Sequence, residues 1–337
     1  ETTYTPKITP VVPTSEDATS TDIQGAIQTG KPVFTEGDSR VPMNDDVPAT
    51  FDDGSTTKTV EGVGTYTVAA DGTVTFVPEK SFTGTASAVT VVREDKNGTK
   101  ASATYTPTVT PVTPTATPAE STDIQGATQT GKPEFTEGNS RVPMNDDVPT
   151  TFDDGLTTKT VDGVGTYTVA ADGTVTFVPE PSFTGTAPVV TVVREDMNGT
   201  KASATYTPSV TPITVTPTDK VSADIQNVPQ TQTPTFDLSN DKTAEITSKK
   251  LVDPATGQPT DETTVTVAGE GTYTIDPTTG AVTFTPEKDF VGTAQGVTVQ
   301  ATATITNANG KTATITSDAT YTPTVVAAVP TAQPATS

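Results

Sequence analysis

The sequence predicts an all-β protein made of tandem immunoglobulin-like β-sandwich repeats, joined end to end as an elongated rod. The main observation is a repeat: Asp22–Val112 aligns without gaps on Asp123–Ile213, a shift of 101 residues, and only 12 of these 91 positions differ. This period exceeds the ~20–50 residues of a solenoid unit and suits a self-contained domain. Apolar residues alternate with Thr inside each copy, and no stretch has a helical period, so the repeats read as β-structure.

The composition is strongly acidic and low in apolar residues. The 337 residues include 41 acidic and 19 basic side chains, with a net charge of -22 and no His, Cys or Trp. This charge disfavours nucleic acid and anionic membrane surfaces as partners. No apolar run approaches the ~20 residues of a membrane helix. We therefore expect no nucleic-acid binding, no membrane insertion and a monomer in solution.

The copies divide the chain into five parts. Residues 1–13 are expected to be the tail of a preceding repeat and a linker, because Thr3–Pro6 matches Thr104–Pro107. Repeat 1 covers residues 14–114, repeat 2 covers 115–217, and a diverged, longer repeat 3 covers 218–330. A C-terminal linker of residues 331–337 follows.

Proline-rich segments lie between the copies. Pro107–Pro118 has a proline every three or four residues. This spacing predicts extended polyproline conformation and a semi-rigid spacer. Val109 and Ile213, in the two segments of this type, are expected to dock on the adjoining repeat.

The first of two hairpins in each copy is marked by alternation around an Asp-Gly turn. In Gly64–Pro78, apolar residues alternate with Thr on both sides of Asp71-Gly72, which predicts a β-hairpin. The hairpin recurs at Gly165–Pro179 and, with a longer turn, at Gly271–Pro286.

The second hairpin begins at Val89–Glu94 and turns at Asn97-Gly98, after which Ala101, Ala103 and Tyr105 return on one face. Repeat 3 extends both arms. Between the hairpins, Phe82 is expected to plug the core and Gly84 to need unusual backbone dihedrals. About seven strands per repeat are expected. The expected core residues, with their counterparts in the other copies, are Tyr66, Phe76, Phe82, Val91 and Tyr105.

Three motifs in combination resemble a known family. They are Gly-Thr-Tyr-Thr-Val at Gly64–Val68, Asp-Gly-Thr-Val-Thr-Phe-Val-Pro at Asp71–Pro78, and Phe-Thr-Gly-Thr-Ala at Phe82–Ala86. All three recur in repeat 2, and repeat 3 keeps them with an altered turn. The pattern resembles the CshA-type fibril repeat of streptococcal (Gram-positive) cell-surface fibrillar adhesins.

The resemblance implies a location and a role. It implies an extracellular protein at the bacterial cell surface, anchored to the cell wall in its full-length form. The repeats would form the stalk of a fibril that projects an adhesive N-terminal region away from the cell. Host fibronectin would be bound only by that region, which these repeats do not contain, so their partners would be neighbouring repeats of the same chain. The alternative is that the repeats themselves mediate adhesion or self-association, by binding a host protein or in biofilm accumulation.

Nothing in the sequence indicates catalysis. His and Cys are absent, and Ser, Lys and the carboxylates form no recognisable nucleophile or acid-pair motif. We expect no enzyme activity, no catalytic residues and no cofactor.

Two acidic clusters contain the oxygen ligands that a calcium site would need. Asn44–Asp46 and Asp52–Gly54 recur as Asn145–Asp147 and Asp153–Gly155, and Glu94-Asp95 precedes a turn. Calcium takes six to eight oxygen ligands, which such clusters could supply. However, the spacing matches no EF-hand loop, and repeat 3 does not preserve it. We expect turn residues on an acidic surface, and no metal site.

The sequence also contains candidate residues for crosslinking and glycosylation. Wall-anchored stalks can carry Lys–Asn isopeptide bonds, but no lysine with a partner recurs at a core-like position in all three copies. The lysines considered were Lys31, Lys58, Lys100, Lys132, Lys159, Lys201 and Lys311. Asn97-Gly98-Thr99 and Asn198-Gly199-Thr200 match the N-glycosylation sequon, but the turn interpretation is preferred.

Overall fold

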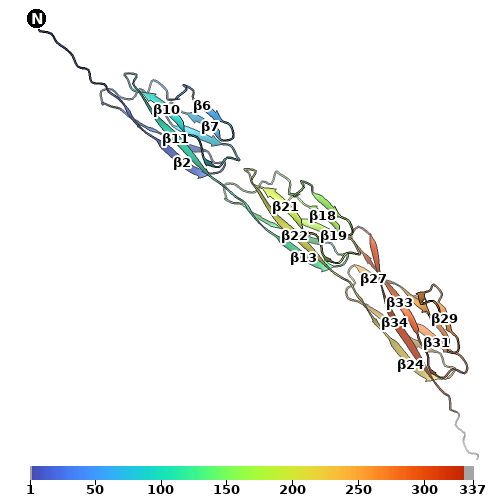
Figure 1. Ribbon diagram of the computed structural model, residues 1–337. Helices are drawn as coiled ribbons and strands as arrows, with labels where there is room; N and C mark the ends of the chain where they lie inside the picture. The colour runs from blue at the N-terminus through green and yellow to red at the C-terminus, as the bar shows by residue number, and fades with distance from the viewer. Residues whose placement is uncertain (1, 330–337) are drawn as a thin grey trace, which may run out of the picture. The chain divides into compact units, whose positions relative to one another are not determined.

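The computed structural model describes residues 2–329, which contain β-strands and no α-helix (Figure 1). In this range no helix is long and apolar enough to cross a membrane. The chain divides into two compact units. Unit 1 comprises Glu1–Thr117, Glu134–Thr150 and Val192–Ala204, and unit 2 comprises Pro118–Pro133, Thr151–Thr191 and Thr205–Ser337. Unit 1 thus combines repeat 1 with part of repeat 2, and unit 2 combines the rest of repeat 2 with repeat 3.

Repeats 1 and 2 have the same succession of eleven strands. Those of repeat 1 are β1 (Thr14–Glu16), β2 (Ala18–Ile23), β3 (Gln28–Gly30), β4 (Val33–Thr35), β5 (Thr50–Phe51), β6 (Thr57–Val60), β7 (Gly64–Val68), β8 (Val74–Pro78), β9 (Gly84–Thr85), β10 (Val89–Glu94) and β11 (Lys100–Thr110). Those of repeat 2 are β12 (Thr115–Thr117), β13 (Ala119–Ile124), β14 (Gln129–Gly131), β15 (Glu134–Thr136), β16 (Thr151–Phe152), β17 (Thr158–Val161), β18 (Gly165–Val169), β19 (Val175–Pro179), β20 (Gly185–Thr186), β21 (Val190–Glu195) and β22 (Lys201–Thr211).

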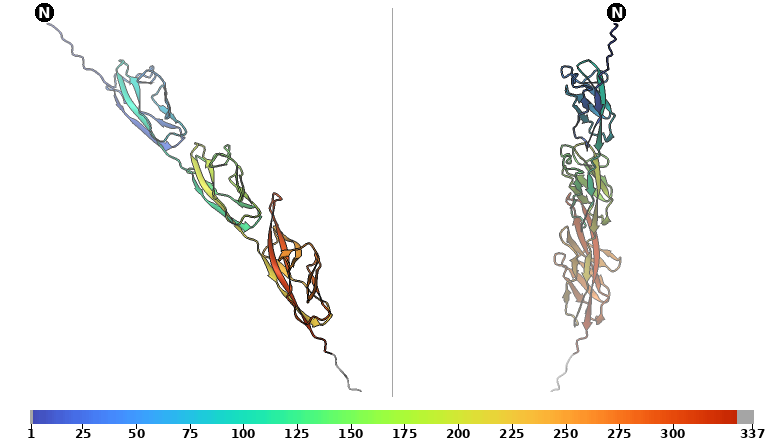
Figure 2. Two further views of the ribbon diagram at one scale, coloured as in Figure 1. Left: turned by 45° about the vertical axis from the view of Figure 1, so that its right-hand side comes forward. Right: turned by 90° about the vertical axis from the view of Figure 1, so that its left-hand side faces the viewer.

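Repeat 3 has longer strands. They are β23 (Val215–Thr218), β24 (Lys220–Ile225), β25 (Gln230–Gln232), β26 (Thr235–Leu238), β27 (Ala244–Asp253), β28 (Gln258–Pro259), β29 (Thr264–Val267), β30 (Gly271–Ile275), β31 (Val282–Pro286), β32 (Gly292–Thr293), β33 (Val297–Thr306) and β34 (Thr312–Val326). The long β33–β34 hairpin reaches beyond the other strands of its repeat (Figure 2). The strand β23 runs across the expected boundary between residues 217 and 218.

Two sheets form the sandwich of repeat 1. One has the order β2-β11-β10-β5, with β9 also paired to β11, and the other has the order β3-β8-β7-β6. The strand β2 runs parallel to β11, whereas β7, β8, β10 and the other partners pair antiparallel. Figure 1 shows β2, β11 and β10 on one side of the repeat and β6 and β7 on the other. The predicted all-β fold of tandem sandwiches is confirmed, while the end-to-end rod stays a prediction.

The core of repeat 1 lies between these sheets. Four expected members, Tyr66, Phe76, Val91 and Tyr105, are fully buried. Phe82 is only partly buried and packs edge-to-face on Phe76, with ring centroids 6.5 Å apart. The apolar alternation predicted these positions because one face of each strand must turn inward. Two further members of this core, Ala49 and Phe51, were not predicted, and Val109, expected to dock on the adjoining repeat, also belongs to it.

Both predicted hairpins are present. The strands β7 and β8 pair around the Asp71-Gly72 turn, and β10 pairs with β11 around Asn97-Gly98. Gly84 has φ +101°, the left-handed region expected for it. Repeat 1 contains eleven strands, more than the expected seven, because segments of two or three residues without visible alternation also pair.

A polar network crosses the edge of each core. In repeat 1, the hydroxyl of Ser20 donates to Gln28 Oε1 at 2.6 Å and lies 2.6 Å from the Tyr105 hydroxyl. The Gln28 amide donates to the carbonyl of Thr108 at 3.0 Å. Equivalent networks form in the other repeats around Tyr206 and Tyr321. Because buried polar groups need partners, each network fixes the second and third strands of its repeat against the last.

The predicted proline spacer is wrong over most of its length. Pro107 and Thr110 lie in β11, Val109 belongs to the core of its own repeat, and β12 begins at Thr115. Proline is tolerated at position 107 of this strand for two reasons. Its carbonyl accepts from the Ala86 amide at 2.9 Å. The pairing of β11 with β10 ends at Tyr105, so β10 needs no backbone N–H from residue 107. Only about four residues therefore separate the last strand of repeat 1 from β12.

Residues at the two ends were also predicted to be linkers. Residues 2–13 contain no strand, and Tyr4, the counterpart of Tyr105, is 88% exposed. Residue 1 and residues 330–337, which include the predicted C-terminal linker, lie outside the described part of the chain.

Candidate functional site at the repeat junctions

The two units each contain one junction between neighbouring repeats. We call the end of β2 and the loop after it, with Asp22, Gln24 and Gly25, the C-terminal face of repeat 1. Its counterpart on repeat 2 is formed by Asp123, Gln125 and Gly126. Junction 1 is the contact of the first face with repeat 2, and junction 2 is the contact of the second face with repeat 3.

Junction 1 is held by an ion pair and two hydrogen bonds. The guanidinium of Arg141 donates to both carboxylate oxygens of Asp22, at 2.8 and 3.0 Å. The amide of Asn198 donates to the Gln24 carbonyl at 2.9 Å, and Gln24 Nε2 donates to the Thr200 hydroxyl at 3.4 Å. Bidentate pairing of this kind fixes orientation as well as distance. The hydrogen bond from Arg141 lowers the pKa of Asp22 below its usual value.

Junction 2 reuses the same C-terminal face with different donors. Lys242 Nζ donates to Asp123 at 3.0 Å, and the Thr243 hydroxyl donates to the Gln125 carbonyl at 2.6 Å. The β33–β34 turn adds two contacts that junction 1 lacks among its described hydrogen bonds. Asn307 Nδ2 donates to the carbonyl of Pro179 at 2.8 Å, and Lys311 pairs with Glu180 at 2.6 Å. The loop after β13 thus receives a cation and a neutral donor, as the loop after β2 does.

Junction 2 also contains a small apolar cluster. Ile213 is 3% exposed and packs with Ala244 and Ile305 of repeat 3. Ile124, Leu238 and Ile315 surround this cluster. Its counterpart in the first connection, Val112, is also 3% exposed. The expectation that Ile213 docks on the adjoining repeat is confirmed, whereas Val109 packs into its own repeat.

A buried glutamine holds the connecting chain at each face. The Gln24 side chain accepts from the Val112 amide at 3.1 Å and donates to the Lys80 carbonyl at 2.8 Å. Gln125 makes the same two bonds, to the Ile213 amide and the Pro181 carbonyl. The amide group thereby anchors the connecting segment to the face that the next repeat covers. These glutamines were not predicted, because their partners lie far away in the sequence.

One substitution between the copies bears on the ion pair. In repeat 1, Arg40 pairs with Asp38 two residues earlier, at 2.8 Å, and this hydrogen bond lowers the pKa of Asp38. The counterpart of Asp38 in repeat 2 is Asn139, whose side-chain oxygen accepts from the backbone N–H of Arg141 at 3.0 Å. Because Asn carries no charge, the Arg141 guanidinium is available for Asp22 of the preceding repeat.

The acidic clusters weighed as calcium sites are paired with cations or local backbone. Asp45 pairs with Arg93 at 2.5 Å, Asp46 with Lys96 at 2.6 Å, and Asp52 with Lys58 at 3.5 Å. Repeat 2 keeps two of these pairs, Arg194–Asp146 and Lys159–Asp153. Among residues 2–329 no group of three or more potential metal-binding side chains occurs.

Asp95 and Asp196, which follow the glutamates noted in the sequence, are fully buried. One oxygen of each accepts two backbone N–H groups of the following turn, at 2.8–2.9 Å. These carboxylates therefore shape the turn that carries Asn97 or Asn198. Asn198 lies in that turn, as the turn interpretation of the sequon expects, and its amide also donates to the Gln24 carbonyl of repeat 1.

The lysines weighed for a crosslink have partly exposed side chains. Lys31 and Lys132 pair with Asp71 and Asp172 across a turn, at 2.7 and 2.8 Å. Lys58, Lys159 and Lys311 pair with carboxylates, as given above, and Lys100 and Lys201 are exposed. These are ordinary surface ion pairs, which contribute little to stability.

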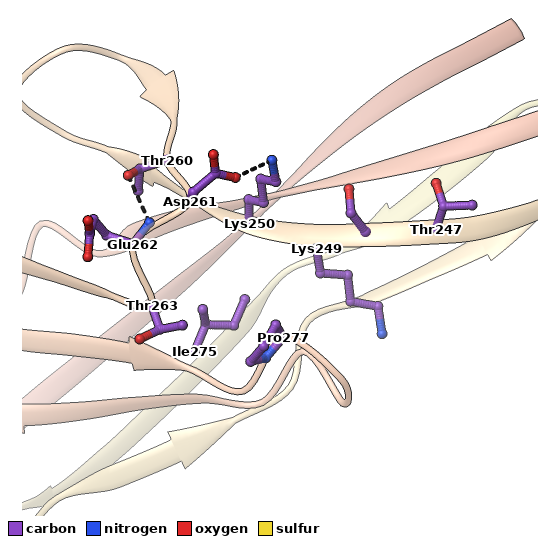
Figure 3. Close-up of a pocket in the computed structure, with 10 residues that line it drawn as sticks. Thr247, Lys249, Lys250, Thr260, Asp261, Glu262, Thr263, Ile275 and Pro277 are labelled. Atoms are coloured by element: carbon purple, nitrogen blue, oxygen red, sulfur yellow. Dashed lines mark hydrogen bonds and ion pairs between the residues drawn. The ribbon is translucent and has the colours of Figure 1, made fainter.

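Repeat 3 carries an open depression of about 270 Å³ beside β27 (Figure 3). Three of its charged groups have partners: Lys250 pairs with Asp261 at 2.6 Å, and Lys249 donates to the carbonyl of Thr279 at 3.1 Å. The dashed lines of Figure 3 mark the Lys250–Asp261 pair and the bond between Thr260 and the Glu262 amide. The repeat junctions are therefore the better candidate for a functional site.

Comparison with known proteins identifies the family. The model of the surface adhesin CshA repetitive domain matches residues 10–109, 111–210 and 212–325. The chain belongs to the CshA repeat family. Membership implies an adhesin-associated repeat at the extracellular cell surface.

Comparison with curated proteins gives no match. Among solved structures, the chain is similar to the N-terminal eight immunoglobulin domains of Down syndrome cell adhesion molecule (15% identity, 94% of this chain, 37% of that chain, TM-score 0.33). It is also similar to the I9–I11 tandem of titin (11% identity, 95% and 99% coverage, TM-score 0.32) and to mouse cadherin-23 EC22–24 (12% identity, 95% and 100% coverage, TM-score 0.35). The chain spans about a third of the first of these (37%).

Proposed function

We propose that these CshA repeats are stalk modules of a cell-wall-anchored bacterial surface fibril. They hold an adhesive N-terminal region away from the cell, and host fibronectin is bound only by that region. The repeats take part in no catalysis and bind no cofactor, nucleic acid or membrane. Their partners are the neighbouring repeats of the same chain.

One observation carries this proposal: the same face is used at both junctions. Asp22 and Gln24 in junction 1, and Asp123 and Gln125 in junction 2, receive a cation and a neutral hydrogen-bond donor from the following repeat. A repeated face-to-face contact is what an array of many copies requires, because each added repeat meets its predecessor in the same way. The short connection between β11 and β12 limits how far neighbours can separate.

The test is small-angle X-ray scattering of this chain, together with sedimentation velocity over a range of concentrations. A stalk predicts a thin, rod-like scattering profile and a monomer at every concentration. A random-coil profile would contradict the stalk. Reversible dimers would instead support the alternative in which the repeats themselves self-associate.

A further inference from the structure

Repeat 3 has a different residue at the position of Gly25 and Gly126. Both glycines have φ near +80°, and the counterpart of both is Asn227, with φ +65°. Asn227 is the one non-glycine residue with positive φ among those described. The backbone of the C-terminal face therefore has the same conformation in all three repeats, and only repeat 3 places a side chain there. Asn tolerates this region better than most residues, so the loop keeps its shape.

In junctions 1 and 2 the following repeat occupies the space in front of the glycine. A Cβ built on Gly126 would lie 3.0 Å from Ile305 Cγ2, 3.2 Å from the Thr306 carbonyl oxygen and 3.4 Å from Thr243 Cβ. These atoms belong to repeat 3, and Ile305 and Thr306 would have to shift by a few tenths of an ångström to admit the Cβ. A Cβ built on Gly25 would overlap the side-chain oxygen of Asn198. Asn198 could move away only by giving up its bond to the Gln24 carbonyl.

The apolar anchor beside this position also differs. The Gln226 side chain accepts from the Ala328 amide at 3.2 Å, as Gln24 and Gln125 accept from Val112 and Ile213. Ala328 is thus the structural counterpart of Val112 and Ile213, which are 3% exposed in the junctions. Ala328 is exposed and presents one methyl group where they present larger side chains. The chain leaves repeat 3 along the same path but without the anchor.

We infer that the residue at the Gly25 position decides whether a repeat can be followed by a docked neighbour, and that repeat 3 cannot. Gly at this position accepts the N-terminal end of another CshA repeat. Asn227 and Ala328 together prevent another repeat from docking on the C-terminal face of repeat 3. Repeat 3 is therefore the last in a run of docked repeats. A further repeat joined after Ala328 would be tethered but not docked. This inference extends the stalk role proposed above by naming the partner of each face.

The first experiment transfers Asn227 into junction 2. The chain has no cysteine, so spin labels at Thr168→Cys and Thr274→Cys, exposed strand positions of repeats 2 and 3, report the distance between these repeats by electron double resonance. We expect Gly126→Asn to replace one narrow distance peak with a broad distribution. The matched control is Gly155→Asn, because Gly155 has φ +81° and nothing within 4 Å of its built Cβ. It should keep the narrow peak.

The second experiment tests the face of repeat 3 itself. Residues 1–328 are followed directly by a further copy of residues 113–217, and one label is placed on each side of the new connection. We expect a broad distribution with Asn227 and a narrow one with Asn227→Gly and Ala328→Val together. A narrow peak for Gly126→Asn, or for the extension with Asn227, would overturn the inference, as would broad distributions in both extensions. Circular dichroism of each variant checks that the repeats remain folded. Since only docking is measured, failure here would leave the scattering test of the stalk unaffected.

Discussion

Truncation of Ile213 should weaken the coupling between repeats 2 and 3 without damaging either sandwich. Ile213 lies outside β22 and is buried by Ala244 and Ile305, so its side chain contributes mainly to junction 2. Ile213→Ala removes three carbon atoms, at ~0.8 kcal/mol each, or about 2–3 kcal/mol in total, which falls at the low end of measured Ile→Ala effects. We expect the summed free energy of unfolding of the chain to fall by this amount.

The assay is urea unfolding followed by far-UV circular dichroism, combined with amide hydrogen exchange. The Ile213 amide donates to Gln125 Oε1, and its exchange should accelerate if the connecting segment is released. The control is Ile8→Ala, the same substitution at a residue that is 88% exposed, which should change stability by less than ~0.5 kcal/mol. If Ile213→Ala costs no more than Ile8→Ala, the apolar cluster does not couple the repeats, and our account of junction 2 is wrong.

Four further predictions follow from the same structure. Because Arg141 lowers the pKa of Asp22, this ion pair stabilises junction 1 at pH values above the unfolded-state pKa of ~3.9, and the stabilisation is lost as pH falls through the lower pKa of the folded state. Asp22→Asn should therefore reduce the pH dependence of the coupling free energy across junction 1 below about pH 5, by no more than ~1 kcal/mol because the pair is exposed. Burial raises the pKa of Tyr66 to about 12, so the neutral side chain stabilises the fold below about pH 10, and this contribution is lost as pH rises toward 12. Tyrosinate absorbance of the native chain should therefore appear at higher pH than tyrosinate absorbance of the chain unfolded in urea. Coincident titration curves would contradict this expectation. Ser20→Ala leaves buried Tyr105 and Gln28 atoms without their partner and should cost about 1–3 kcal/mol in thermal unfolding, with Ser20→Ala and Tyr105→Phe together costing less than the sum of the single changes. Intact mass should equal that of the sequence, 34.6 kDa, and a mass lower by one ammonia would reveal an isopeptide bond.

The elements predicted correctly are those that local rules determine. The β7–β8 hairpin follows from alternation around Asp71-Gly72, and the burial of Tyr66 and Phe76 follows from which face of a strand turns inward. The period of 101 residues gave the repeat organisation before any contact was known. The three motifs of the first hairpin and the segment after it led to the family, and the family comparison confirms it.

The prediction of a proline-rich spacer was wrong because it relied on proline content and did not take account of strand pairing around each proline. Pro107 looks like a linker residue, yet the structure needs only its carbonyl, which accepts from Ala86. The parallel pairing of β11 with β2 extends past this proline to Thr110 and Ile23. A strand of this kind depends on a partner some ninety residues earlier in the chain, so no local pattern could reveal it.

By itself, the sequence determined that this protein is a series of β-sandwich repeats, because turn residues and apolar alternation act over a few neighbouring positions. Only the tertiary structure decided what joins the repeats. The bond between Gln24 and the Val112 amide spans 88 residues, and the pair between Arg141 and Asp22 spans 119. Gly126 and Asn227 look alike as turn residues in the sequence, and only the structure shows that atoms of repeat 3 lie where a side chain at Gly126 would be. Such a contact cannot be read from local pattern, because it forms where one repeat meets the next.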